Sequence, residues 1–127
     1  MKKILATVLA IGILGTWGLT SAQAKPNKRC DSEGKACRLL TFQDLQQGYH
    51  LFRNNCKTCH HWNNDQGAQF LYTESLSMKG WNRVFAKRYS TCARKGHWDK
   101  LSQEELAKIN DYLYANAWDA SDPHVSL

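Results

Sequence analysis

The chain has 127 residues, a formal net charge of +6 and 43% hydrophobic residues, so it is long enough for a single globular domain. Eight glycines and two prolines exclude a collagen-like or low-complexity chain, and no repeat of about 20–50 residues points to a solenoid or propeller. Five cysteines are many for this length, and their spacing carries most of the functional information.

The first 24 residues have the pattern of a secretory signal peptide. Lys2 and Lys3 precede an uncharged, mostly apolar run, Ile4–Leu19, and a small-x-small cleavage pattern ends at Ala24. An uncleaved membrane anchor is the alternative, but three glycines and two threonines weaken the run as a bilayer span. We therefore expect cleavage near Ala24, a periplasmic or equivalent exported location, and no membrane association afterwards.

Removal of the signal peptide would leave residues 25–127 with a net charge of +4, divided into an extension (25–40) and a domain (41–127). The extension is polar and has no helical period. Its Cys30 and Cys37 are separated by six residues, and such a short loop closes readily. An exported compartment preserves disulfides, so we expect a Cys30–Cys37 bridge to hold the extension.

The whole chain after the signal peptide is predicted to be all-α with long loops, because no segment alternates cleanly enough for a strand. Thr41 and Asp44 form a capping-box-like start for a helix in the segment that ends at Trp62. Residues 63–78 are loop-like, a second helix is expected over Lys79–Lys95, and Gly96 ends it. A third helix begins at Ser102. The first and third helices have apolar stripes at helical spacing: Leu45, Gly48, Tyr49 and Phe52, then Leu106, Ile109, Leu113 and Ala117.

The residues that indicate chemistry are Cys56-Lys57-Thr58-Cys59-His60, a C-x-x-C-H motif. Two thiols three positions apart can both add to the vinyl groups of one haem, and the following histidine can bind the iron. A thioredoxin-like dithiol would be expected beside a βαβ pattern, which is absent. A zinc site would need a second ligand pair, for which Cys92 and His97 are poorly spaced, and a simple Cys56–Cys59 disulfide leaves His60 unexplained. The motif predicts one covalent haem c.

The segment Gly48–Cys56 resembles the N-terminal helix of class I cytochromes c, with Gly48 eight and Phe52 four residues before the first haem cysteine. Leu106–Ala117, with Ile109, Tyr112 and Leu113, resembles the C-terminal helix of that family. The resemblance covers about residues 41–117. It implies a class I cytochrome c fold in which these two helices cross at Gly48 under an aromatic side chain, and it implies His60 as the proximal iron ligand.

The sequence departs from the family at the distal iron ligand. The expected chain after cleavage has one methionine, Met78, which is only 18 residues after His60 and is not followed by proline. The region before the last helix instead contains Cys92 and His97. Cys92 has an electropositive sequence environment that favours its thiolate, and we favour it as the distal ligand. Met78 and His97 remain alternatives, and so does a disulfide between Cys92 and another cysteine.

A thiolate ligand favours ferric iron and a low potential, so we expect a one-electron carrier rather than an enzyme. The ligand set and size are similar to those of the small paired cytochromes called NaxLS. The alternatives are a haem module that binds or senses NO or CO, and a haem subunit of a sulfur-oxidising enzyme. Expected partners are an acidic redox protein and possible homo- or heterodimers with another small cytochrome, but no nucleic acid. The acidic partner would dock on a basic cluster: Arg83, Lys87, Arg88, Arg94, Lys95 and Lys100.

Overall fold

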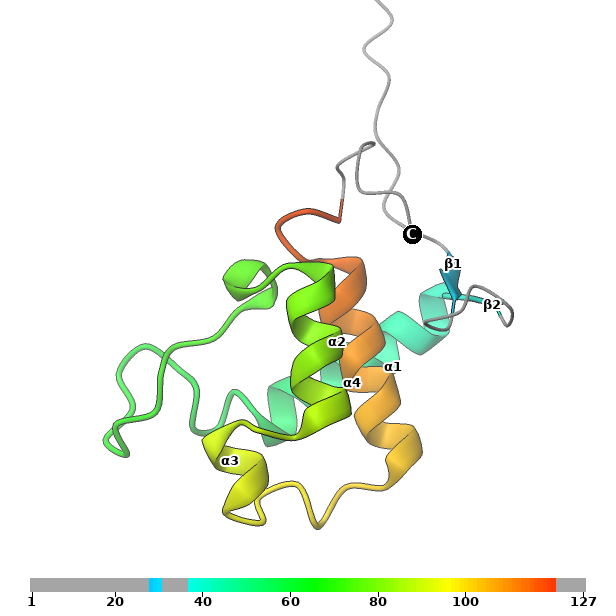
Figure 1. Cartoon of the computed structure of the whole chain (residues 1–127). Helices are drawn as coiled ribbons and strands as arrows, with labels where there is room; N and C mark the ends of the chain where they lie inside the picture. Colours follow the sequence, from blue (N-terminus) through cyan, green and yellow to red (C-terminus); the bar gives the residue numbers. More distant parts are fainter. Residues whose placement is uncertain (1–27, 31–36, 121–127) are drawn as a thin grey trace, which may run out of the picture.

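The computed structural model describes residues 28–30 and 37–120, and the predicted signal peptide lies outside these residues. The described chain is mostly helical, as predicted (Figure 1). Its elements, in chain order, are β1 (Lys28–Cys30), β2 (Cys37–Leu39), α1 (Phe42–Asn55), the 3₁₀ helix η1 (Thr73–Ser75), α2 (Met78–Lys87), α3 (Thr91–Arg94) and α4 (Gln103–Ala115). No helix among the described residues is both long and apolar enough to span a bilayer.

Helices α1 and α4 cross at Gly48, as the resemblance implies. Gly48 is buried, and a Cβ atom placed there would lie 2.2 Å from the Lys108 carbonyl oxygen and 2.8 Å from Tyr112 Cβ. Only a residue without a side chain allows this backbone approach. The rings of Phe52 and Tyr112 pack beside the crossing, with centroids 5.9 Å apart. The crossing fixes the direction of α1, and therefore the position of the motif that follows its last residue.

Helix α4 is the centre of the core and packs against both α1 and α2 (Figure 1). The predicted start is confirmed, because Ser102 caps the helix and forms a reciprocal capping box with Glu105. The whole predicted stripe is buried: Leu106, Ile109, Leu113 and Ala117. The start of α1 is confirmed in the same way, with Thr41 and Asp44 capping each other.

The single helix predicted over 79–95 is wrong. Helix α2 ends at Lys87, because Arg88 adopts a left-handed backbone conformation with φ of 48°, and the short helix α3 begins after Ser90. The guanidinium of Arg88 donates to Gln103 Oε1 at 2.7 Å, beside the start of α4. The break turns the chain after α2, so Cys92 lies on a separate element from Trp81 and Val84.

The N-terminal extension is a small antiparallel hairpin of β1 and β2, and the predicted absence of strands is wrong here. The predicted Cys30–Cys37 disulfide joins the two strands and is confirmed. Residues Arg29 and Arg38 face each other in the pairing, and both bind the carboxylate of Asp111 on α4, whose side chain is 1% exposed. Arg29 also donates to Asn82 on α2. The hairpin is therefore tied to the helical core through one buried carboxylate.

Candidate functional site

The C-x-x-C-H motif forms one extra turn beyond the end of α1. Cys56 caps the helix, and its backbone N–H donates to the Phe52 carbonyl at 2.8 Å. The Cys56 carbonyl then accepts from the N–H groups of Cys59, at 3.2 Å, and His60, at 2.9 Å. The turn includes both cysteines, and both thiols are free of disulfides. The predicted attachment residues therefore form one compact unit.

The imidazole of His60 is oriented by a backbone carbonyl. Its Nδ1 lies 2.6 Å from the carbonyl oxygen of Gln69, and because a carbonyl can only accept, Nδ1 carries the hydrogen. In the neutral ring the lone pair is then on Nε2. Histidines that bind metals usually donate their other ring N–H to a carbonyl or carboxylate, which fixes the ring orientation. His60 therefore has the tautomer that an Nε2 metal ligand needs.

The loop that supplies the Gln69 carbonyl is fixed at both of its ends. The ammonium group of Lys57 donates to the carbonyl oxygens of His60, at 3.1 Å, and Leu71, at 2.8 Å. Within the loop, the side-chain amide of Asn64 bonds to four backbone groups, including the N–H and C=O of Ala68. These bonds hold residues 60–71 in one conformation, so the Gln69 carbonyl has a defined place.

Burial keeps the thiol of Cys56 protonated. Desolvation is the main cause that raises the pKa of Cys56 to about 12; a nearby Cys92 adds to the rise and Lys100 opposes it. A thioredoxin-like dithiol has the opposite arrangement, with its reactive cysteine at a helix N-terminus and a lowered pKa. Cys56 instead follows the C-terminal end of α1. Cys56 therefore lacks the helix N-terminus that lowers the pKa of a reactive thiol in such a dithiol.

The structure brings Cys92 near Cys56, although 35 residues separate them in the chain. Cys92 is half-buried in α3, and its sulfur lies 3.4 Å from the hydroxyl of Ser90. No three histidine, cysteine or acidic side chains gather into a metal-binding group within residues 28–30 and 37–120.

The two other candidate distal ligands lie in different surroundings. Met78 begins α2, at the opposite end of this helix from the turn that leads to Cys92. It is buried in the core, and its backbone N–H donates to Asp119 Oδ1 at 2.7 Å. His97 is exposed, and its backbone N–H donates to the Cys92 carbonyl. Cys92 is close enough to Cys56 to add to the rise of its pKa, for which desolvation is the main cause.

The basic cluster predicted from the sequence is at the surface. All six of its side chains are exposed, and they lie on the second half of α2, on the turn after it, on α3, and on the segment between α3 and α4: Arg83, Lys87, Arg88, Arg94, Lys95 and Lys100. Lys100 is close enough to Cys56 to lower its pKa. The cluster therefore extends to the neighbourhood of the C-x-x-C-H turn.

Sequence reasoning missed three residues that build the site, namely Gln69, Lys57 and Asn64. Gln69 acts through its backbone carbonyl, which no side-chain pattern reveals. Asn64 lies in the polar run Asn-Asn-Asp-Gln-Gly, whose composition indicates a loop but not which amide organises it.

Searches against family models, curated proteins and solved structures gave no match to this chain.

Proposed function

We propose that the chain is an exported monohaem c-type cytochrome that transfers single electrons. The observation that supports the proposal most strongly is the His60 geometry: a C-x-x-C-H turn whose histidine already donates Nδ1–H to a backbone carbonyl. A disulfide or dithiol function needs no such histidine. The two free thiols and the available Nε2 are the donor set that a covalent haem requires.

Each residue of the turn has a separate role in this proposal. Cys56 and Cys59 would hold a haem through two thioether bonds, each thiol adding its sulfur and its hydrogen across one vinyl group so that no group is released. His60 would offer Nε2 to the iron, and the Gln69 carbonyl keeps its ring from rotating. Lys57 holds together the loop that carries Gln69. The bound haem supplies a one-electron Fe(III)/Fe(II) couple.

We assign the distal position to Cys92. Its proximity to Cys56 and its half-burial support this choice over Met78, which is packed in the core at the far end of α2. A thiolate stabilises ferric iron, so the proposal implies low-potential electron transfer. The exposed basic cluster supports docking of an acidic redox partner, because long-range attraction between opposite charges raises the rate of encounter.

One observation favours a second function, the binding of NO or CO. Among the described elements, α3 has no close backbone contact with another helix or strand. Few packing contacts mean a low cost for local movement, so a ligand carried by α3 can be displaced more easily than one in the core. This alternative predicts that CO binds to the reduced protein, whereas a carrier with a firmly held distal ligand excludes it.

Redox titration tests the proposed function. The full chain, exported by a host that attaches haem c, is titrated with optical detection beside Cys92→Ser and a control, Ser90→Ala. We expect reversible one-electron behaviour, a low-spin thiolate signature in the ferric spectrum, and loss of that signature with a higher potential in Cys92→Ser. Ser90→Ala should keep the signature. A chain without a haem spectrum would refute the function, and an unchanged spectrum in Cys92→Ser would refute the assigned ligand.

A further inference from the structure

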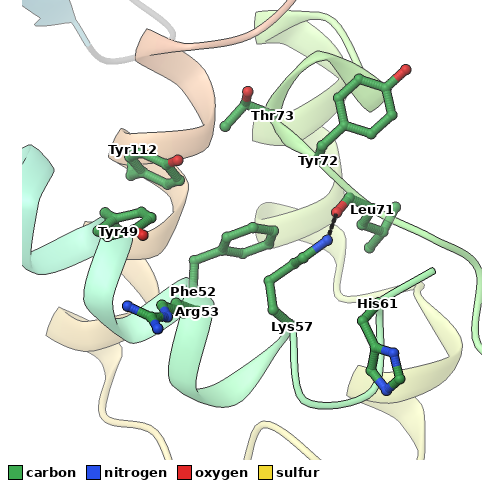
Figure 2. Close-up of a pocket in the computed structure, with 9 residues that line it drawn as sticks. All are labelled: Tyr49, Phe52, Arg53, Lys57, His61, Leu71, Tyr72, Thr73 and Tyr112. Atoms are coloured by element: carbon green, nitrogen blue, oxygen red, sulfur yellow. Dashed lines mark hydrogen bonds between the residues drawn. The ribbon is translucent and has the colours of Figure 1, made fainter. Parts of the chain in front are cut away.

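An open hollow lies between α1, α4 and the segment before α2, and Lys57 of the C-x-x-C-H motif is part of its lining (Figure 2). Its volume is about 420 Å³, within the range of small-molecule sites. Its residues are Tyr49, Phe52, Arg53, Lys57, His61, Leu71, Tyr72, Thr73 and Tyr112. None of the functions considered above uses this surface.

The walls of the hollow are aromatic. The rings of Tyr49 and Tyr112 meet edge to face with centroids 5.6 Å apart, and Phe52 lies beside Tyr112 (Figure 2). Tyr72 lies across from this pair and remains 49% exposed. Aromatic side chains attract another planar ring through dispersion and edge-to-face contacts. The hollow therefore offers ring faces from two sides.

The charges of the hollow have one sign. Its two charged residues, Arg53 and Lys57, are both basic, and none of its nine residues is acidic. Lys57 is engaged by two backbone carbonyls and lies over the ring of Phe70. By contrast, Arg53 is exposed and has no ion pair or side-chain hydrogen bond within residues 28–30 and 37–120. Its guanidinium is free to form a paired contact with an external carboxylate.

One carboxylate, that of Glu74, lies beside the hollow. Glu74 follows Thr73 and accepts a hydrogen bond from the Thr73 hydroxyl at 2.8 Å. It is close enough to contribute to the raised pKa of Tyr112, for which desolvation is the main cause. Glu74 therefore repels an anion in the hollow, and its removal should strengthen anion binding.

We propose that this hollow binds a small planar aromatic anion, a carboxylate or sulfonate, with its ring between Tyr72 and the Tyr49–Tyr112 pair and its anionic group at Arg53. The combination of aromatic walls, a free guanidinium and no acidic lining residue identifies this ligand class. The cysteines Cys56, Cys59 and Cys92 do not line the hollow.

Calorimetric titration with 2-naphthoate tests the proposal, using the full chain with its hairpin disulfide formed. Two probes separate ring from charge: 2-naphthalenemethanol keeps the ring without the anion, and cyclohexanecarboxylate keeps the anion without the aromatic ring. We expect saturable binding of 2-naphthoate and weaker binding of both analogues. NMR signals of the tyrosine rings should shift at Tyr49, Tyr72 and Tyr112.

Matched variants assign the contacts. Arg53→Gln should weaken 2-naphthoate binding about threefold to tenfold, as expected for loss of a charge-assisted hydrogen bond near the surface. Arg83→Gln removes an equal charge outside the hollow and should change the affinity less than twofold. Glu74→Gln should strengthen binding, and Tyr72→Leu should weaken it. Each variant is first compared with the parent chain by thermal unfolding.

Three results would overturn the proposal. The first is the absence of saturable binding. The second is cyclohexanecarboxylate binding as tightly as 2-naphthoate, or Arg53→Gln and Arg83→Gln losing equal 2-naphthoate affinity. Either result would mean nonspecific attraction of an anion to a basic protein. The third is concentration-dependent self-association that covers the hollow and that 2-naphthoate does not reverse, which would make a second copy of the chain the occupant. The haem spectrum tests the cytochrome proposal, and the calorimetric titration tests the hollow. The two measurements are independent, so a failure of one proposal can be told from a failure of the other.

Discussion

Replacing Gly48 with alanine perturbs the helix crossing on which the position of the site depends. The new Cβ would lie 2.2 Å from the Lys108 carbonyl oxygen, whereas carbon–oxygen contacts of this kind need about 3.3 Å. The two helices must therefore separate by about 1 Å. The clash involves backbone and the Cβ of Tyr112, so no change of rotamer relieves it.

Two opposing terms set the size of the effect. Alanine gains about 1 kcal/mol over glycine in helix propensity, while overpacking of a close contact typically costs about 1–3 kcal/mol. Because the clash is with backbone, we take the upper end of the cost and expect Gly48→Ala to lose about 2 kcal/mol of unfolding free energy. Separation of the helices also weakens the contact of Phe52 with Tyr112.

Urea unfolding followed by far-UV circular dichroism measures the loss. Gln47→Ala is the matched control, because Gln47 is the exposed neighbour in α1 and its replacement changes propensity without a contact. We expect this control to remain within about 0.5 kcal/mol of the parent chain. A Gly48→Ala chain as stable as the parent, or more stable, would refute the crossing and the orientation of the C-x-x-C-H turn derived from it.

Three further predictions concern the hairpin and the motif. Asp111→Asn removes the carboxylate shared by the two hairpin arginines, and the free energy of unfolding measured in urea should fall by about 2–4 kcal/mol. A fall of less than about 0.5 kcal/mol would contradict the role of Asp111 in attaching the hairpin to the core. In the haem-free chain at pH 8, the raised pKa of Cys56 lowers the fraction of this residue present as thiolate about a thousandfold relative to an ordinary cysteine. Alkylation of Cys56, followed by mass spectrometry, should therefore be far slower in the folded than in the denatured chain. Equal alkylation rates would contradict the burial of Cys56. Lys57→Met should speed amide hydrogen exchange in residues 60–71, because Lys57 bonds to the carbonyls of His60 and Leu71. The control, Lys79→Met, replaces an exposed lysine of α2 and should leave this exchange unchanged. Unchanged exchange in Lys57→Met would refute the role of Lys57 in holding the loop.

Helix starts were predictable because their signals are local. Thr41 with Asp44, and Ser102 within three residues of Glu105, cap their helices through bonds to neighbours in the chain. The Cys30–Cys37 disulfide was predictable for the same reason, since six residues separate its two cysteines. Features fixed by nearby residues can be derived from the sequence alone.

The missed features depend on distant partners or on backbone. The apolar pattern of residues 79–95 continues through Arg88, and nothing local marks its left-handed conformation. Asp111 lies within the third predicted helix, but its two partners are 82 and 73 positions away in strands of three residues each. The Gln69 carbonyl has no signature in any side chain. The chemical motif could be predicted, whereas the groups that orient it could not.

Covalent haem attachment is the central claim, and intact mass measured under denaturing conditions tests it most directly. The chain is exported by a host with haem c maturation, and the double variant Cys56→Ala, Cys59→Ala is the control. We predict that the parent chain carries the mass of one haem, begins after Ala24 and retains the hairpin disulfide, whereas the double variant carries none. A parent chain with no added mass under these conditions, or with a Cys56–Cys59 disulfide, would contradict the account.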